Sequence, residues 1–178
     1  MNQVDYKIIY AGPEWLDRWI AFCQEVYSVY YVRPEHGITK KMFSKDIFAK
    51  SGFEGYVKEH FANNPDRGAW LALGAEEEII GSLCVHNHNG YCELKGFYVS
   101  PDKKGQGIGR ALYEKAVVFA GDLPMKLDVV HDMDQTIAMY ERWGFRVDET
   151  RGYILYPWKD WTESARYANR GIYMVKDS

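Results

Sequence analysis

Apolar and polar residues alternate along the chain with two different periods, and together they predict a succession of strands and helices. From Pro13 to about Tyr30 apolar residues recur every three to four positions, which predicts an amphipathic helix with proline in its first turn. The buried face of this helix is expected to carry Trp15, Leu16, Trp19, Phe22, Cys23 and Val26. Residues 5–10, just before it, are predicted to form a short first strand.

Two short helices are predicted next. Thr39 stands at a cap position for a helix over 40–50, and Gly52 interrupts it before a second helix over 53–61. Turn residues over 63–68 end this helical region.

Three strands rich in β-branched and aromatic residues are expected in the middle of the chain, over residues 69–74, 79–87 and 91–100. The dipeptide Asn89-Gly90 between the last two is a strong signal for a tight hairpin.

The rest of the chain predicts a helix over 108–120, a strand over 125–131 and a helix over 135–143. Gly144 stands where a left-handed cap residue ends a helix. Two final strands, 145–156 and 171–176, are expected to form a closing hairpin joined by the unusually long segment 157–170. This order predicts a mixed α/β sheet with helices packed on it, in a single domain over residues 1–178.

Composition and charge narrow the class of protein. The 178 residues are 47% hydrophobic and 26% charged with a formal net charge of −3, which is typical of a globular domain and argues against nucleic-acid binding. We find no signal peptide and no apolar run long enough to span a membrane. Three cysteines without CxxC spacing are typical of free thiols in a reducing compartment. We therefore expect a cytoplasmic protein without a membrane partner.

The stretch 103–120, KKGQGIGRALYEKAVVFA, places Gly105, Gly107 and Gly109 directly before a predicted helix, although glycine disfavours helices. A strand, a glycine-rich turn and a helix N-terminus together form an anion site, because unpaired amides and the helix dipole point to one spot. The Walker pattern and the dinucleotide fingerprint GxGxxG are both missing. A phosphate or pyrophosphate is the expected occupant, and a tight turn without a ligand is the alternative.

Two runs of residues carry a resemblance to a known family. LKGFYVSPDKKGQGIGRALYEKA resembles motif A of the GNAT superfamily of N-acetyltransferases, and MDQTIAMYERWGF resembles its second motif. The resemblance extends over about residues 5–176, and its specific parts are 92–112 and 133–145. It implies the GNAT acyl-CoA N-acyltransferase fold and acetyl-CoA as cosubstrate, with no metal required. Lys104 departs from the usual Arg or Gln, and Met133 and Thr136 stand where Asn and Ala are common.

The resemblance also implies residues that bind the cosubstrate. Main-chain groups of Phe97, Tyr98 and Val99 would bind the pantetheine arm as they would an added strand. Backbone amides would hold the pyrophosphate, and these belong to Gly105, Gln106, Gly107, Ile108, Gly109 and Arg110. The side chains of Lys104 and Arg110 would add positive charge, unless they belong to a solvated helix start.

Acetylation requires a neutral amine, whereas a lysine-like amine with a pKa of about 10.4 is almost entirely protonated at pH 7, so a general base is expected. Glu93, four residues before Phe97, matches the position of a catalytic glutamate in some members of the family. The alternative role for Glu93 is a pairing interaction across the sheet.

Tyr140 matches the tyrosine that often lies beside the sulfur in the family, and it would protonate the CoA thiolate. The alternative is that Tyr140 is a plain core tyrosine.

Other polar groups have simpler interpretations. His86 and His88 could bind a metal from one strand face, but they adjoin a turn and lack an obvious third ligand, so solvated turn residues are expected. Asp128 and His131, at the end of a predicted strand, could lie near the acceptor cleft.

The acceptor is expected between the N-terminal helices and the last strands, where aromatic and acidic residues would suit a cation. These residues are Tyr27, Tyr30, Tyr31, Glu35, Phe53, Tyr56, Tyr153, Tyr156 and Trp158. We expect an N-acetyltransferase acting on a primary amine such as a small polyamine, an amino acid or a protein terminus. A non-catalytic acyl-CoA-binding sensor or scaffold is the alternative. A longer acyl chain and a homodimer both remain open.

Overall fold

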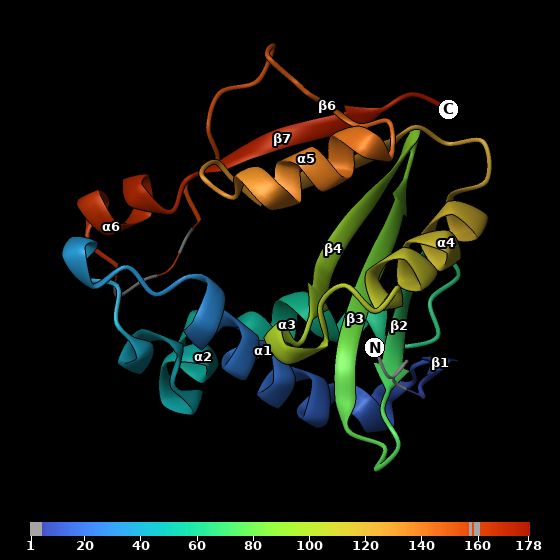
Figure 1. The fold of residues 1–178 in the computed structure, drawn as a ribbon, viewed down its shortest axis with the longest axis horizontal. Coiled ribbons are helices and arrows are strands. Elements are labelled where there is room, and N and C mark those ends of the chain that lie inside the picture. Colours follow the sequence, from blue (N-terminus) through green and yellow to red (C-terminus); the bar gives the residue numbers. More distant parts are fainter. Residues whose placement is uncertain (1–4, 157, 159–160) are drawn as a thin grey trace.

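A seven-stranded sheet runs through the molecule in the order β1-β2-β3-β4-β5-β7-β6 (Figure 1). The computed structural model describes residues 5–156, 158 and 161–178. The strands are β1 (Lys7–Tyr10), β2 (Arg67–Leu73), β3 (Ile79–His88), β4 (Tyr91–Val99), β5 (Met125–Val130), β6 (Arg146–Val147) and β7 (Gly171–Lys176). Neighbouring strands are antiparallel except β4 and β5, which are parallel. The predicted mixed α/β class is confirmed.

Helices lie on both faces of this sheet. They are α1 (Leu16–Tyr30), α2 (Lys45–Ser51), α3 (Phe53–Val57), α4 (Ile108–Ala120), α5 (Asp134–Arg142) and α6 (Glu163–Ala168). Short 3₁₀ turns span Pro13–Trp15, Pro34–His36, Lys40–Phe43, Lys58–His60 and Pro101–Lys103. In the part of the chain that the structure describes, none of the helices combines the length and apolar character needed to cross a membrane.

Alternate residues of the central strands face opposite sides of the sheet and so build two separate cores. Leu71 and Leu73 of β2 belong to one core with Trp19 of α1. Ala72, between them, belongs to the other core with Leu112 of α4. In Figure 1 the helices α1, α2 and α3 lie together near one end of β4, whereas α5 lies along β7.

The helix predicted over 40–50 is broken in the structure. Its first part is the 3₁₀ turn Lys40–Phe43, and α2 begins only after Ser44, whose ψ of 157° is extended. Thr39 occupies the cap position but its side chain makes no capping hydrogen bond. Phe43 is 3% exposed, so tertiary packing of this side chain overrides the local helical pattern.

The predicted closing hairpin is only partly correct. The strand expected over 145–156 shrinks to the two residues of β6 and an isolated bridge between Ile154 and Gly171. Strand β7 lies between β5 and β6. It pairs with β5 along its whole length but with β6 at only two positions. The segment between the two predicted strands contains α6, which Thr162 caps by accepting a hydrogen bond from the Ala165 amide at 3.1 Å.

Candidate functional site

The two parallel strands at the centre of the sheet separate along their length. β4 and β5 pair at only two positions, Cys92 with Met125 and Glu93 with Lys126. Beyond these pairs β4 continues to Val99 along β3, while β5 continues along β7. The main-chain groups of β4 and β5 that face this gap therefore do not pair with one another.

A bulge in β4 lies directly beside the gap. Gly96 and Phe97 together face the single residue Leu83 of β3, and Gly96 has a φ of +53°. A Cβ at Gly96 would lie 2.8 Å from Cζ2 of Trp19, closer than two carbons can approach. The Ser82 hydroxyl donates to the Gly96 carbonyl at 2.7 Å. Glycine is required here both for its backbone conformation and for its lack of a side chain.

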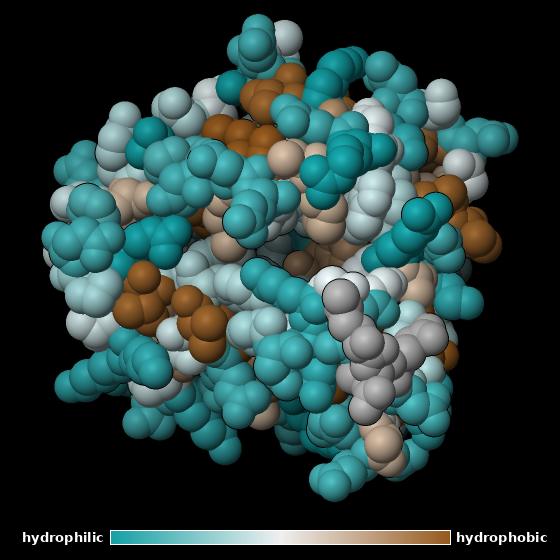
Figure 2. All heavy atoms as spheres, viewed as in Figure 1, coloured by the Kyte–Doolittle hydropathy of each residue, from teal (hydrophilic) through white to brown (hydrophobic). Residues whose placement is uncertain are grey.

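A cavity of about 1070 Å³ opens in this gap. Figure 2, viewed from the same side as Figure 1, shows a hollow near the middle of the molecule, with a largely hydrophilic rim. The wall comes from α1, β4, the loop before α4, β5, α5 and the segment after β6. The predicted site residues found in this wall are Glu93, Phe97, Tyr98, Val99, Lys104, Gly105, Gly107, Ile108, Gly109, Arg110 and Tyr140.

The glycine loop opens onto the cavity. Gly105 and Gly107 have φ values of +76° and +83°, and a Cβ on either would meet no protein atom within 4 Å. The first hydrogen bond of α4 runs from the Ala111 amide to the Gly107 carbonyl at 3.0 Å. The amides before Ala111 therefore have no intrahelical acceptor and are available to an anion. Gly109 differs, because it has no positive φ and its Cβ would make ordinary contact with Val99 at 3.6 Å.

Side chains around the loop add charge at its edge. The Lys104 ammonium lies over the Tyr30 ring at 4.2 Å from its centroid. Arg110 is exposed and pairs with Glu114 one turn along α4, at 3.2 Å. Gln106 turns its Oε1 atom inward, where it is buried without a hydrogen-bond partner among the described residues.

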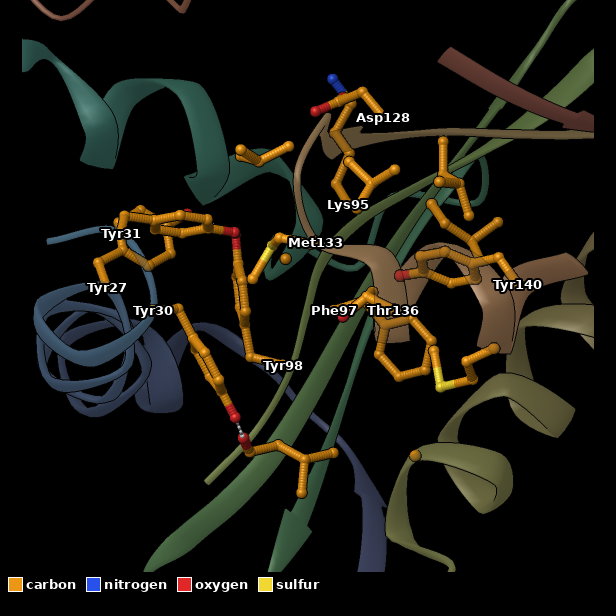
Figure 3. Close-up of a pocket in the computed structure, with 18 of the residues that line it drawn as sticks. Tyr27, Tyr30, Tyr31, Lys95, Phe97, Tyr98, Asp128, Met133, Thr136 and Tyr140 are labelled. Carbon is orange, nitrogen blue, oxygen red and sulfur yellow. Dashed lines mark hydrogen bonds between the residues drawn. The ribbon is translucent and has the colours of Figure 1, made fainter. Parts of the chain in front are cut away.

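A row of tyrosines joins α1 to β4. The Tyr30 hydroxyl donates to the Val99 carbonyl at 2.9 Å, the bond drawn dashed in Figure 3. The Tyr98 hydroxyl donates to that of Tyr27 at 3.0 Å and accepts from Tyr31 at 3.4 Å. Burial raises the pKa of Tyr31 to about 12 and also raises the pKa values of Tyr27 and Tyr98, so these three phenols stay protonated at neutral pH.

Tyr140 reaches the cavity from α5. Its ring is 6% exposed and packs against Phe97, Trp143 and Phe145 at centroid distances of 6.2, 6.0 and 5.7 Å. Figure 3 shows its hydroxyl pointing into the cavity, toward the side where Met133 and Tyr98 lie. Burial raises the pKa of this phenol, so it is a proton donor rather than a phenolate.

Glu93 lies at the last position of β4 that pairs with β5, and its carboxylate already has partners. His88 Nε2 lies 2.9 Å from Glu93 Oε2, and Lys95 Nζ lies 3.2 Å from the same oxygen. Lys95 also donates to the hydroxyl of Tyr56. His86 and His88 are half-buried within β3, whereas the sequence predicted that they are solvated turn residues. Glu93 lies beside them as a third group of the kind that binds metals, which the sequence did not reveal.

Asp128 of β5, which the sequence suggested could lie near the acceptor cleft, is a second carboxylate in the cavity wall. The Tyr156 hydroxyl donates to its Oδ2 at 2.6 Å. Burial raises the pKa of the Asp128 carboxyl, while the Tyr156 hydrogen bond and the more distant charges of Lys95 and Arg151 oppose that rise. Figure 3 shows Asp128 at the far end of the cavity from Tyr30.

Comparison with known proteins matches residues 25–145 to the acetyltransferase (GNAT) family. The chain belongs to the GNAT family. The curated peptidyl-lysine N-acetyltransferase YjaB of Salmonella typhimurium is 26% identical over 83 residues, which are 47% of this chain and 53% of that protein. The chain thus spans about half the length of the curated relative that it matches.

Solved structures of GNAT proteins share the fold. A GNAT acetyltransferase of Staphylococcus aureus matches with a TM-score of 0.66 and 16% identity, covering 97% of this chain and 98% of that one. The PaiA N-acetyltransferase of Thermoplasma acidophilum, solved with coenzyme A, matches with a TM-score of 0.61 and 20% identity, covering 98% and 99%. These likenesses confirm the predicted GNAT fold.

Two positions in this GNAT chain depart from the family motif at the start of α5. Met133 stands at the N-cap, and its carbonyl accepts hydrogen bonds from the Thr136 and Ile137 amides, both at 2.9 Å. Its thioether lines the cavity where the motif more often has the amide of asparagine. Methionine at this position makes the cavity wall apolar and offers no side-chain amide for hydrogen bonding.

Proposed function

We propose that the chain transfers an acetyl group from acetyl-CoA to a primary amine. The observation that carries this proposal is the continuity of the gap between β4 and β5 with the glycine loop at the start of α4. A gap between strands accommodates an extended arm, and free amides at a helix start accommodate the phosphates at its end. Membership of the GNAT family supports the same ligand.

The residues present fit acetyl-CoA. The open space above Gly105 and Gly107 leaves room for a pyrophosphate against the amides of the loop, with Lys104 and Arg110 at its edge. The main-chain groups of Phe97, Tyr98 and Val99 that do not bond to β3 would be the partners of the pantetheine arm, because β5 does not pair with β4 at these residues. The Val99 carbonyl has a second lone pair beside the one that Tyr30 uses.

The reaction needs a base for the amine and an acid for the departing sulfur. Tyr140 is the acid, because its phenol is protonated and points into the cavity. The resemblance implies Glu93 as the base, and Asp128 is a second carboxylate in the same wall.

The acceptor is a cationic primary amine, either a small polyamine or a lysine side chain. Tyrosine and tryptophan rings form much of the wall away from the glycine loop, and such rings attract ammonium groups. The peptidyl-lysine acetyltransferase among the curated relatives supports the same chemical group in an acceptor. A cytoplasmic location remains a prediction from composition.

Calorimetric titration with acetyl-CoA, and with pantetheine that lacks the phosphates as control, tests the proposal. We expect saturable binding of acetyl-CoA and much weaker binding of pantetheine. Absence of acetyl-CoA binding would contradict the proposal. Release of CoA thiol in the presence of an amine panel separates an enzyme from a protein that only binds acyl-CoA.

A further inference from the structure

We propose that the Asp128 carboxylate, held by Tyr156, binds the ammonium group of the acceptor and accepts its proton. This places the base on β5 rather than at Glu93 on β4, and it rests on the proposed acetyl transfer.

The position of Asp128 along β5 favours this role. Glu93 pairs with Lys126, which is the last point at which β4 and β5 are joined. Asp128 comes two residues later on β5, where the strands have separated and the cavity begins. On its other side Asp128 is in register with Tyr173 of β7, which fixes the backbone that carries it.

The partners of the two carboxylates differ. Glu93 already has two basic partners, His88 and Lys95. Among the ion pairs formed by the described residues, none includes Asp128. Its hydrogen-bond donor is the neutral hydroxyl of Tyr156. Of the two carboxylates in the described cavity wall, Asp128 is therefore the one that lacks a cation.

The surroundings of Asp128 are suited to a proton acceptor. Burial raises the pKa of Asp128 above its ordinary value, which makes the carboxylate a stronger base than an exposed aspartate. Titratable and charged groups face it from β4, α1, α5 and the segment after β6, namely Lys95, Glu93, Tyr27, Tyr31, Tyr140, Arg151 and Tyr156. The tyrosines among them stay neutral, and neither Lys95 nor Arg151 forms an ion pair with Asp128, so the carboxylate is left for an incoming ammonium beside aromatic rings.

The protons balance in this scheme. The ammonium gives one proton to Asp128, and the neutral nitrogen forms a bond to the acetyl carbon while the carbonyl π electrons move to oxygen. When the carbonyl re-forms, the carbon–sulfur bond breaks with its electron pair going to sulfur, which takes a proton from Tyr140. The nitrogen of the adduct returns its second proton to Tyr140. The amide and the CoA thiol are released, and the proton on Asp128 passes to solvent.

A matched pair of amines tests the base function. Ethylamine is an ammonium ion at neutral pH, whereas 2,2,2-trifluoroethylamine is largely uncharged and needs no base. We expect Asp128→Asn to lower kcat/KM for ethylamine by about 100-fold and for trifluoroethylamine by less than about 10-fold. Equal losses for both amines would indicate a structural role and overturn the proposal, as would a larger selective loss in Glu93→Gln than in Asp128→Asn.

Folding and charge controls accompany this comparison. Asp122→Asn removes an exposed carboxylate from the turn before β5 and should match the parent chain. Asp128→Asn should keep or raise Tm, because burial disfavours the charged form of Asp128. Tyr156→Phe keeps the carboxylate but removes its donor, so we expect a loss of about 3- to 10-fold with ethylamine.

Binding provides a readout that does not depend on turnover. Spermidine is titrated into the protein with and without saturating CoA, and we expect Asp128→Asn to weaken binding by about 10-fold or more while Asp122→Asn does not. Failure of the parent chain to bind spermidine, or equal binding by Asp128→Asn, would overturn the ammonium site. A parent chain that binds spermidine but not acetyl-CoA would instead contradict the proposed acetyl transfer.

Discussion

The two ends of the cavity are built from different parts of the chain. The end at the glycine loop is built largely from backbone, since Gly105 and Gly107 leave amides facing open space. The end at Asp128 is built from side chains, with a carboxylate, a hydroxyl and aromatic rings supplied by elements far apart in sequence. The first end suits a group shared by every acyl-CoA, and the second is free to differ between acceptors. Substitutions at the two ends should therefore act on different steps.

The largest effect is expected from the side chain between the two ends. Tyr140→Phe removes the proposed proton donor and should lower kcat by about 100-fold, because a thiolate then leaves without a proton. Acetyl-CoA affinity, measured by calorimetry, should change little, since the ring and its packing remain. Tyr113→Phe is the matched control, because the Tyr113 hydroxyl bonds to Lys176 outside the cavity. A comparable loss of kcat in the control would contradict the assignment of Tyr140.

The bulge that lies beside the gap should be the most sensitive point for stability. Gly96→Ala places a left-handed alanine and a Cβ against buried Trp19, at a combined cost of about 3 kcal/mol. For a chain of this length we expect Tm to fall by roughly 10 °C. Gly55→Ala, at an exposed position of α3, has no atom within 4 Å of its new Cβ and should stabilise slightly, by up to about 1 kcal/mol. Equal Tm values for the two variants would show that the bulge is not strained by a side chain.

The same contrast explains what the sequence could predict. Gly105 and Gly107 stand in a contiguous run, and the backbone that they define needs no distant partner, so the loop was recognisable from spacing alone. Tyr140 was recognisable because the short motif fixes its register on α5. Both features depend on local sequence.

Asp128 and its partner depend instead on the arrangement of distant segments. Tyr156 reaches Asp128 from just beyond the bridge between Ile154 and Gly171, whereas the sequence predicted a continuous strand through this segment. A Cβ at Gly171 would lie 2.5 Å from the Tyr156 hydroxyl, so the passage of this segment depends on a glycine that no local pattern marks. In the same region, the start of α6 could have been predicted from the sequence, since Thr162 followed by Glu163 is typical of a helix start.

A smaller effect is expected inside the glycine loop, and it tests whether backbone conformation matters there. Gly107→Ala puts alanine at a φ of +83°, so acetyl-CoA should bind about 10-fold more weakly. Gly109→Ala has no such strain and should bind within about 3-fold of the parent chain. Calorimetry on both variants decides the matter. The opposite order would mean that the space above Gly109, rather than the conformation of Gly107, admits the phosphates.

The smallest effect is expected from the charges at the edge of the loop. Lys104 is exposed and rests on the Tyr30 ring, so Lys104→Ala should weaken acetyl-CoA binding by only about 2- to 3-fold at physiological ionic strength. The difference should shrink further as salt is added, because exposed charges are screened over about 8 Å or less. Arg18→Ala, an exposed cation stacked on Trp15 away from the cavity, is the matched control. A loss after Lys104→Ala that exceeded that of Gly107→Ala would reverse the comparison, because a side chain rather than the backbone would then dominate the phosphate end.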